Sequence, residues 1–266
     1  MYPYAQRETK GFYVMSDGLE YDEFYRRANG SEAFSRYCEE TFGVDLTQDG
    51  FTDRDQLDYL INFVHMNAKD IGIDVGCGNG RTANYVAGKT GAAMFGLDKS
   101  RVAIDFARER YGKASDWSVG DINEIDLEPG KFTVALFLDS LYFSDDIRAT
   151  LERAYSGLRE GGRIGIMHSD FRLNVDARPD KTVSTNADIA RVIRQNGWRS
   201  NFVDFTDQHF RVMKRKNAAC QRNRPLFEGE RNLCLYDRIA AESVGEETCR
   251  GDFDSFSNRY AFCIYK

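Results

Sequence analysis

A glycine-rich stretch in the first third of the chain constrains the fold more than any other feature. Residues 71–75 form a short apolar run that leads directly into Gly76-Cys77-Gly78-Asn79-Gly80. Glycines at alternate positions permit positive φ angles and a close approach of the backbone to a ligand. A helix predicted to begin at Asn79 would direct its free N–H groups into the same space. The stretch therefore predicts a strand, a tight turn and a helix that form a ligand cradle at the carboxyl end of a sheet.

The chain after Asp70 alternates between apolar runs and amphipathic segments. The predicted strands are 71–75, 92–97, 116–119, 133–138, 163–168, 199–205 and 259–265. Helices are expected between them, one capped by Ser100 and a later one by Ser184 or Thr185. This order predicts an α/β fold with an open, mostly parallel sheet and helices on both faces. The last strand alternates less clearly, and we expect it at an edge or as an antiparallel strand.

Two regions outside this alternation are expected to be helical covers. Residues 1–69 contain three predicted short helices, the second capped by Ser31 and the third by Thr52. Residues 206–256 form a long insertion before the last strand, with helices expected near 207–219 and 225–242. We therefore expect an N-terminal helical lid over 1–69 and a main domain over 70–266 that carries a second lid.

Composition and charge exclude several classes of partner. The 266 residues carry a formal net charge of −6, which argues against a non-specific polyanion binder. No apolar run reaches the ~18 residues that a membrane span needs, and the chain start lacks a signal pattern, so a cytoplasmic protein is expected. The six cysteines include no C-x-x-C pair, so no metal site is expected. The expected partner is a small molecule, without nucleic acid or membrane, and the expected state is a monomer or homodimer.

Three acidic residues stand on or just after the first three predicted strands. Asp74 lies on the first strand, Asp98 at the tip of the second and Asp121 at the tip of the third. A carboxylate at the second tip can bind both hydroxyls of a ribose. Asp121 could accept a hydrogen bond from an adenine amino group, and Ile122 could pack on the ring. Together with the glycine spacing, these positions predict a nucleotide-like ligand.

Residues 70–170 resemble a class I S-adenosylmethionine-dependent methyltransferase. The segments that carry the resemblance are Ile73-Asp74-Val75-Gly76-Cys77-Gly78-Asn79-Gly80, Gly96-Leu97-Asp98, Gly120-Asp121-Ile122 and Leu138-Asp139-Ser140-Leu141-Tyr142. The resemblance implies a Rossmann-like sheet of seven strands with a reversed last strand, and S-adenosylmethionine as cofactor. It also implies that the glycine turn approaches the methionine part, Asp98 the ribose, and Asp121 with Ile122 the adenine.

A narrower resemblance, to phosphoethanolamine and other small-molecule amine methyltransferases, covers more of the chain. It is carried by Phe34-Ser35-Arg36-Tyr37, by Phe42-Gly43 and by Asn258-Arg259-Tyr260. It implies that Tyr37 closes over the cofactor. One departure is that the catalytic histidine of those enzymes would fall near Phe143, which cannot move a proton. The cofactor-binding residues that the two resemblances imply are Tyr37, Asp74, Gly76, Cys77, Gly78, Asp98, Lys99, Asp121, Ile122 and Leu138.

The sequence indicates the residues that would contact the methyl acceptor less clearly than those that would bind the cofactor. Methyl transfer requires that the acceptor atom is aligned with the methyl group and that water is excluded. An acceptor that is a neutral amine needs no general base. The catalytic candidates are Tyr142 and His168, expected at the ends of the fourth and fifth strands, with packing as the alternative role for each. Tyrosine and phenylalanine side chains before residue 40 could form a cage for a cation, although packing is expected for most.

We expect a methyltransferase that acts on a small molecule in an enclosed site. Nitrogen is the first expectation for the acceptor atom and oxygen the second, with carbon or sulfur as alternatives. Acidic charge and the absence of an Asn-Pro-Pro-Tyr-type tetrapeptide after the fourth strand disfavour an RNA or protein methyltransferase. A non-catalytic nucleotide-binding module is the alternative from another class.

Overall fold

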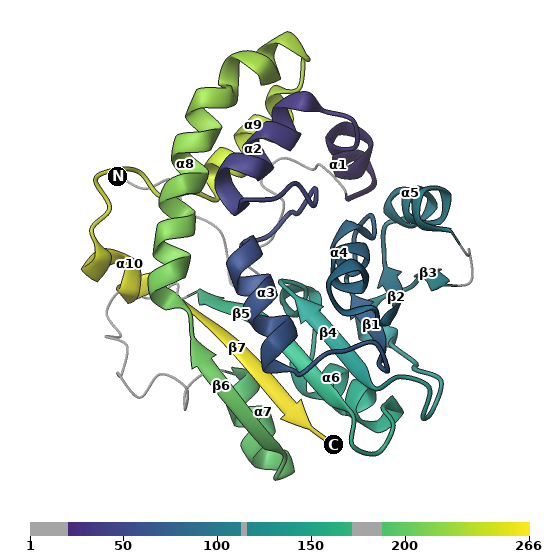
Figure 1. Ribbon diagram of the computed structural model, residues 1–266. Coiled ribbons are helices and arrows are strands. Elements are labelled where there is room, and N and C mark those ends of the chain that lie inside the picture. The colour runs from purple at the N-terminus through teal and green to yellow at the C-terminus, as the bar shows by residue number, and fades with distance from the viewer. Residues whose placement is uncertain (1–20, 113–115, 172–187) are drawn as a thin grey trace.

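The sheet of the computed structural model, which describes residues 21–112, 116–171 and 188–266, follows the predicted alternation. Its strand order is β3-β2-β1-β4-β5-β7-β6 (Figure 1). The strands are β1 (Ile71–Val75), β2 (Ala93–Asp98), β3 (Trp117–Val119), β4 (Val134–Leu138), β5 (Arg163–Phe171), β6 (Arg199–Asp204) and β7 (Ser257–Tyr265). The strand order reverses between β1 and β4, and ligands bind beyond the carboxyl ends of the strands at such a switch point.

The last strand is reversed, as the sequence predicts, but it does not lie at an edge. β7 runs antiparallel to both β5 and β6 and is inserted between them. Eight of its nine residues are buried, whereas β6 is largely exposed and forms the edge of the sheet. Of the two alternatives for residues 259–265, the antiparallel insertion is therefore confirmed and the edge position is excluded, because a strand lies on each side of β7.

Helices cover both faces of the sheet (Figure 1). One face packs against α3 (Arg54–Phe63), α4 (Arg81–Thr90) and α5 (Arg101–Tyr111). The other packs against α6 (Ile147–Gly157) and α7 (Asp188–Asn196). Leu60 and Val86 are buried in the apolar interface on the first face, and Leu151 and Ile193 are buried in the interface on the second. Burial of such side chains is the main force that holds the helices on the sheet.

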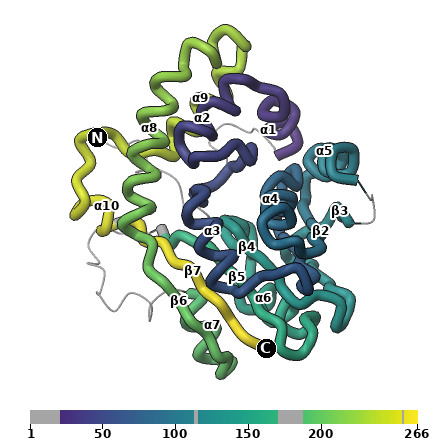
Figure 2. Tube along the Cα trace, viewed as in Figure 1, coloured from purple at the N-terminus to yellow at the C-terminus, as the bar shows by residue number. Residues whose placement is uncertain are grey.

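A separate helical layer lies above the carboxyl ends of the strands, and we call it the cap. It consists of α1 (Tyr21–Ala28), α2 (Glu32–Phe42), α8 (Thr206–Gly229) and α9 (Leu233–Ala241) (Figure 2). These helices share one apolar core, to which Phe34, Cys220 and Leu235 contribute. Helices from both regions that the sequence suggests as covers thus pack together, whereas α3 of the N-terminal region packs on the sheet. A short helix, α10 (Arg250–Phe256), leads from the cap back into β7.

The ends of the helices confirm some of the predicted caps and contradict others. Ser31 and Ser100 are N-caps, and each side chain accepts a hydrogen bond from the third backbone N–H that follows it. The prediction of Thr52 as a cap was wrong, because Asp53 caps α3. The expected break after residue 219 was also wrong, since α8 continues through Pro225. The cap predicted at Ser184 or Thr185 lies outside the described residues.

Two glycines offer a matched test of the packing. A Cβ atom on Gly96 in β2 would lie 2.6 Å from Cys77 Sγ and from the Trp117 ring, whereas one on Gly88 in α4 would meet nothing within 4 Å. We expect Gly96→Ala to lower the free energy of unfolding by roughly 1–3 kcal/mol, because a packed ring must move. Gly88→Ala should raise it by about 0.5–1 kcal/mol through helix propensity. Urea denaturation measures both, and equal effects would contradict the packing described.

Candidate active site

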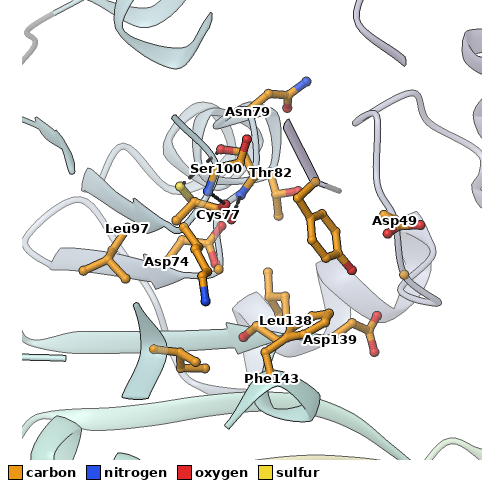
Figure 3. Close-up of a pocket in the computed structure, with 18 of the residues that line it drawn as sticks. Asp49, Asp74, Cys77, Asn79, Thr82, Leu97, Ser100, Leu138, Asp139 and Phe143 are labelled. Atoms are coloured by element: carbon orange, nitrogen blue, oxygen red, sulfur yellow. Dashed lines mark hydrogen bonds between the residues drawn. The ribbon is translucent and has the colours of Figure 1, made fainter. Parts of the chain in front are cut away.

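A cavity of about 830 Å³ lies at the carboxyl ends of β1, β2 and β4, beneath the cap. Its walls come from the turns that follow β1, β2, β3 and β4, from α1, and from the segment 46–52 that connects α2 to α3. Figure 3 shows Asp74, Cys77, Ser100 and Leu138 of the sheet side together with Asp49 of the connecting segment around this space. The volume is within the range of small-molecule sites in proteins.

The glycine turn forms one wall, and its conformation requires glycine. Gly76, Gly78 and Gly80 have φ angles of +83°, +55° and +78°. A Cβ on Gly76 would lie 2.5 Å from Ser140 Cβ, and one on Gly78 would lie 2.2 Å from the Tyr25 hydroxyl. The turn is therefore enclosed by the β4 turn on one side and by α1 on the other. The N–H groups of Gly76 and Cys77 donate to the Leu97 carbonyl, which ties the turn to the end of β2.

The acidic strand tips lie in the same cavity wall. Gly78 N donates to Asp98 Oδ2 and Ser100 N donates to Asp98 Oδ1, both at 2.8 Å. Burial raises the pKa of Asp98 in spite of these two bonds. Asp121 accepts from Asn123 N, and this bond, with Lys99 Nζ at 3.0 Å, keeps the pKa of Asp121 below its usual value. Both carboxylates are thus held in fixed positions at the cavity surface.

The comparisons with known proteins agree with this geometry. A sequence model of the family described as "Methyltransferase domain" matches residues 73–162, which include the glycine turn and the tips of β2, β3 and β4. The sheet order with its antiparallel seventh strand is the topology of one class of these enzymes. Residues 73–162 are a class I S-adenosylmethionine-dependent methyltransferase domain.

This methyltransferase is similar to enzymes with different acceptors. It is 27% identical to phosphoethanolamine N-methyltransferase 1 of Arabidopsis thaliana over 93% of the chain and 51% of the plant protein. It is 26% identical to 27-O-demethylrifamycin SV methyltransferase of Amycolatopsis mediterranei over 86% of the chain and 90% of that protein. The chain thus spans about half the length of the plant relative and 56% of a fungal O-methyltransferase.

A solved structure shares the fold over nearly the whole chain. Phosphoethanolamine N-methyltransferase 2 of Haemonchus contortus, solved with phosphomonomethylethanolamine and S-adenosylhomocysteine, superposes with a TM-score of 0.65 at 17% identity. The match covers 93% of this methyltransferase and 60% of the nematode protein. S-adenosylmethionine is the cofactor of these enzymes, and the relatives with nitrogen and oxygen acceptors leave the acceptor atom open.

The Asp74 carboxyl group is buried in the glycine-turn wall. It is 1% exposed, and its Oδ1 atom has no hydrogen-bond partner among the described residues. Burial, with a contribution from the charge of Asp98, raises the pKa of Asp74 to about 7. A cationic group in the cavity would therefore stabilise the ionised form of Asp74.

The opposite wall is built around a buried ion pair. Arg259 Nη1 donates to Asp139 Oδ1 at 2.7 Å, and Nη2 donates to Oδ2 at 3.0 Å. Asp139 lines the cavity and is 8% exposed, whereas Arg259 is fully buried on β7. Burial opposes ionisation of Asp139, but the guanidinium outweighs it and holds the pKa of Asp139 well below its usual range.

Aromatic rings and a further carboxylate complete this side of the cavity. Tyr21, Tyr25 and Phe143 line it, and the Tyr21 and Phe143 rings meet edge to face with centroids 5.4 Å apart. Asp49 also lines the cavity and accepts from Arg238 Nε at 3.2 Å. The Arg238 guanidinium lies over the Tyr21 ring, 5.3 Å from its centroid. The wall therefore combines ring faces with carboxylates that are already paired.

Helix α1 is attached directly to the sheet side of the cavity. The Ser100 hydroxyl and Val102 N both donate to Asp22 Oδ1, at 2.6 and 3.2 Å. Asn79 Nδ2 donates to Asn29 Oδ1 at 2.7 Å. These bonds hold the tyrosines of α1 over the glycine turn.

Most of the predicted cofactor-binding residues line the cavity, and one does not. The predicted residues that line it are Asp74, Gly76, Cys77, Gly78, Asp98, Lys99, Asp121, Ile122 and Leu138. Tyr37 is 1% exposed and packs in the cap core between Phe34 and Phe42. Among the described residues, the tyrosines that line the cavity are Tyr21 and Tyr25. Tyr37 faces the cap core because its side of α2 packs against α8.

Tyr142 and His168, the predicted catalytic residues, lie together behind the cavity wall. Neither is among the lining residues, and their rings stack with centroids 4.5 Å apart. The Tyr142 hydroxyl donates to Asp139 Oδ1 at 3.1 Å and accepts from Ser169 N at 2.7 Å. Burial raises the pKa of Tyr142, so the phenol keeps its proton.

Sequence reasoning missed Asp139, Arg259 and Asp49. Asp139 stands directly after β4, in a segment that the resemblance already quoted. Arg259 directly precedes the apolar run 260–264, in a segment that the narrower resemblance already quoted. A charge on a buried strand needs a buried partner. Asp49 gives no comparable signal, because its position depends on how the connecting segment folds.

The raised pKa of Asp74 predicts a pH dependence of stability. Between about pH 4 and pH 7 the folded chain binds more protons at this site than the unfolded chain, so the free energy of unfolding falls as pH rises through this range. Asp74→Asn removes the titration. We expect wild type to lose on the order of 2 kcal/mol relative to this variant between pH 5 and pH 8, since one pKa unit is worth about 1.4 kcal/mol.

Urea unfolding of cofactor-free protein at both pH values measures this difference. Asp105→Asn is the matched control, because its side chain is 59% exposed on α5. Parallel pH profiles for wild type and Asp74→Asn would contradict the perturbed pKa.

Proposed function

We propose that this chain transfers the methyl group of S-adenosylmethionine to a nitrogen atom of a small molecule inside the cavity. One observation carries the proposal: carboxylates occur on every wall of a cavity that also presents aromatic rings. The carboxylates are those of Asp22, Asp49, Asp74, Asp98, Asp121, Asp139 and Asp145, and the rings are those of Tyr21, Tyr25 and Phe143. The cofactor carries a sulfonium and an ammonium, and a methylated amine is a cation. Both suit an acidic, aromatic cavity.

The proposed cofactor pose follows the walls described above. Asp98 accepts hydrogen bonds from the ribose, and its position at 2.8 Å from two backbone N–H donors supports this role. Asp121 and Ile122 contact the adenine, with Lys99 holding Asp121 in place. The methionine part lies along Gly76, Cys77 and Gly78, with Leu138 beside it. Its ammonium group would favour the ionised form of Asp74, and the position of Asp74 in the cavity wall supports this assignment.

The proposed reaction is a direct displacement. The lone pair of the acceptor nitrogen attacks the methyl carbon, the carbon–sulfur bond breaks, and S-adenosylhomocysteine leaves with the bonding electrons. An acceptor nitrogen that carries a hydrogen then loses a proton to water. The protein contributes alignment and exclusion of water, and the cap over the strand ends supports both. Asp139 is a poor base for this step, because its pKa is held low and its oxygens already accept several hydrogen bonds.

The ribose assignment predicts a specific loss of affinity. Asp98→Ala should weaken binding of S-adenosylhomocysteine by roughly 1–3 kcal/mol, the usual value of a hydrogen bond to a charged group. Isothermal titration calorimetry measures the change, and Asp105→Ala on the neighbouring helix is the control. An affinity equal to that of wild type would refute the assignment of Asp98. No heat with wild type would instead favour a non-catalytic module.

The acceptor assignment predicts the outcome of a substrate screen. Purified protein is incubated with S-adenosylmethionine and panels of small amines, phenols and carboxylic acids, and S-adenosylhomocysteine release is measured. We expect turnover with amines, at a rate that increases with pH as the amine loses its proton. Turnover confined to phenols or acids would overturn nitrogen as the acceptor atom and leave oxygen as the alternative.

A further inference from the structure

The buried Arg259 side chain uses all of its nitrogen atoms. Its Nε atom donates to Gln56 Oε1 at 2.6 Å, and its Nη1 atom donates to Ser169 Oγ at 2.8 Å as well as to Asp139. Its Nη2 atom donates to Thr52 Oγ1 at 2.7 Å and to Asp139. One side chain on β7 therefore joins α3, the end of β5, the turn after β4 and the segment that precedes α3.

The Asp139 carboxylate is correspondingly saturated with donors. Its Oδ2 atom accepts from Phe51 N at 2.9 Å, from the Thr52 hydroxyl at 2.7 Å and from Arg259. Its Oδ1 atom accepts from the Tyr142 hydroxyl and from Arg259. Five donors occupy the lone pairs of one carboxylate, which leaves no position for a proton from a substrate.

The pair also fixes the backbone on both sides of the cavity. Asp139 has a φ angle of +53°, an uncommon conformation for a residue other than glycine. A Cβ on Gly50 would lie 3.0 Å from Asp139 Cβ, so the connecting segment passes directly over this turn. The next residue, Ser140, abuts Gly76 of the glycine turn. Asp139 thus contacts segment 46–52, and Ser140 contacts the glycine turn. Figure 3 shows Asp139 on the same side of the cavity as Asp49, across from Cys77.

We propose that Asp139 and Arg259 are positioning residues that fix the acceptor wall of the cavity. The inference rests on the proposed function, because the gap that they set is the gap in which acceptor and cofactor meet. Asp139 holds segment 46–52 and the turn that carries Phe143, and Arg259 holds Asp139. Removal of the pair should disturb the acceptor wall and leave the cofactor side intact.

The test compares Asp139→Asn, Thr52→Val and Asp70→Asn with wild type. Thr52→Val keeps the side-chain shape and removes one hydroxyl from the network, so it serves if the buried charge change prevents folding. Asp70→Asn is the matched control, because Asp70 also pairs with a partly buried arginine, Arg163, at 2.7 Å and also accepts from a threonine hydroxyl. That second pair lies at the opposite end of the sheet, where β1 begins.

Three measurements separate the alternatives. Hydrogen–deuterium exchange reports the protection of residues 46–53, which includes the Phe51 amide that donates to Asp139. Calorimetry with S-adenosylhomocysteine reports the cofactor side. The pH profile of kcat is measured with whichever amine the substrate screen identifies.

We expect Asp139→Asn to accelerate exchange over 46–53 by about tenfold or more, since local opening follows the loss of the bonds that hold a segment. We expect kcat/KM for the acceptor to fall by about tenfold to a hundredfold, mostly in kcat, as for lost alignment. The dissociation constant of S-adenosylhomocysteine should change by less than about threefold, the size expected for a site that is not in contact. Thr52→Val should show the same pattern with smaller effects, and Asp70→Asn should show none of it.

Several results would overturn the inference. Unchanged exchange over 46–53 in both Asp139→Asn and Thr52→Val would show that the pair does not hold the segment. Loss of a titration from the pH profile of Asp139→Asn would make Asp139 a general base. If S-adenosylhomocysteine affinity fell by as much as kcat/KM, Asp139 would support the whole cavity and not the acceptor wall in particular. If wild type binds no S-adenosylhomocysteine, the proposed function fails, while the exchange result still decides whether the pair holds the wall.

Discussion

The buried ion pair between Arg259 and Asp139 is the interaction on which the acceptor side of this methyltransferase depends. Burial of two charges costs several kcal/mol per ion, and only close pairing with further hydrogen bonds offsets that cost. The direction of β7 makes the pairing possible. Because β7 runs antiparallel to β5, its amino-terminal residues lie at the carboxyl ends of the parallel strands, where Arg259 is opposite Ser169. A parallel seventh strand would place the same residue at the far end of the sheet, away from Asp139.

Paired and unpaired carboxylates are unevenly distributed around the cavity. Asp49, Asp121 and Asp139 each have a cationic partner, in Arg238, Lys99 and Arg259. Asp74 and Asp98 have no cationic partner within the part of the chain that the structure describes, and burial raises the pKa of both. The uncompensated negative potential is therefore greatest beside the glycine turn. A cationic ligand bound there would favour the ionised forms of both carboxyl groups, as the proposed cofactor pose requires.

The features that the sequence predicts well are those fixed by local chemistry. The glycine turn, the caps at Ser31 and Ser100 and the strand-tip acids follow from backbone conformation and from the direction of parallel strands. The errors arise where tertiary packing decides. The orientation of α2 turns Tyr37 into the cap core, the apolar face of α8 continues past Pro225, and Asp53 takes the capping role because Thr52 bonds to Asp139. No periodicity could pair Arg259 with Asp139, because 120 residues separate them.

The matched family region and the proposed acceptor wall have different boundaries. The match over residues 73–162 contains the glycine turn, the strand-tip acids and Asp139. It excludes Arg259, segment 46–52 and the cap helices, which come from both ends of the chain. The sulfonium is already activated, so selection on the acceptor side acts on shape and charge and does not require a fixed catalytic group. A wall assembled from distant segments and held by one ion pair can therefore change its acceptor while the cofactor side stays the same.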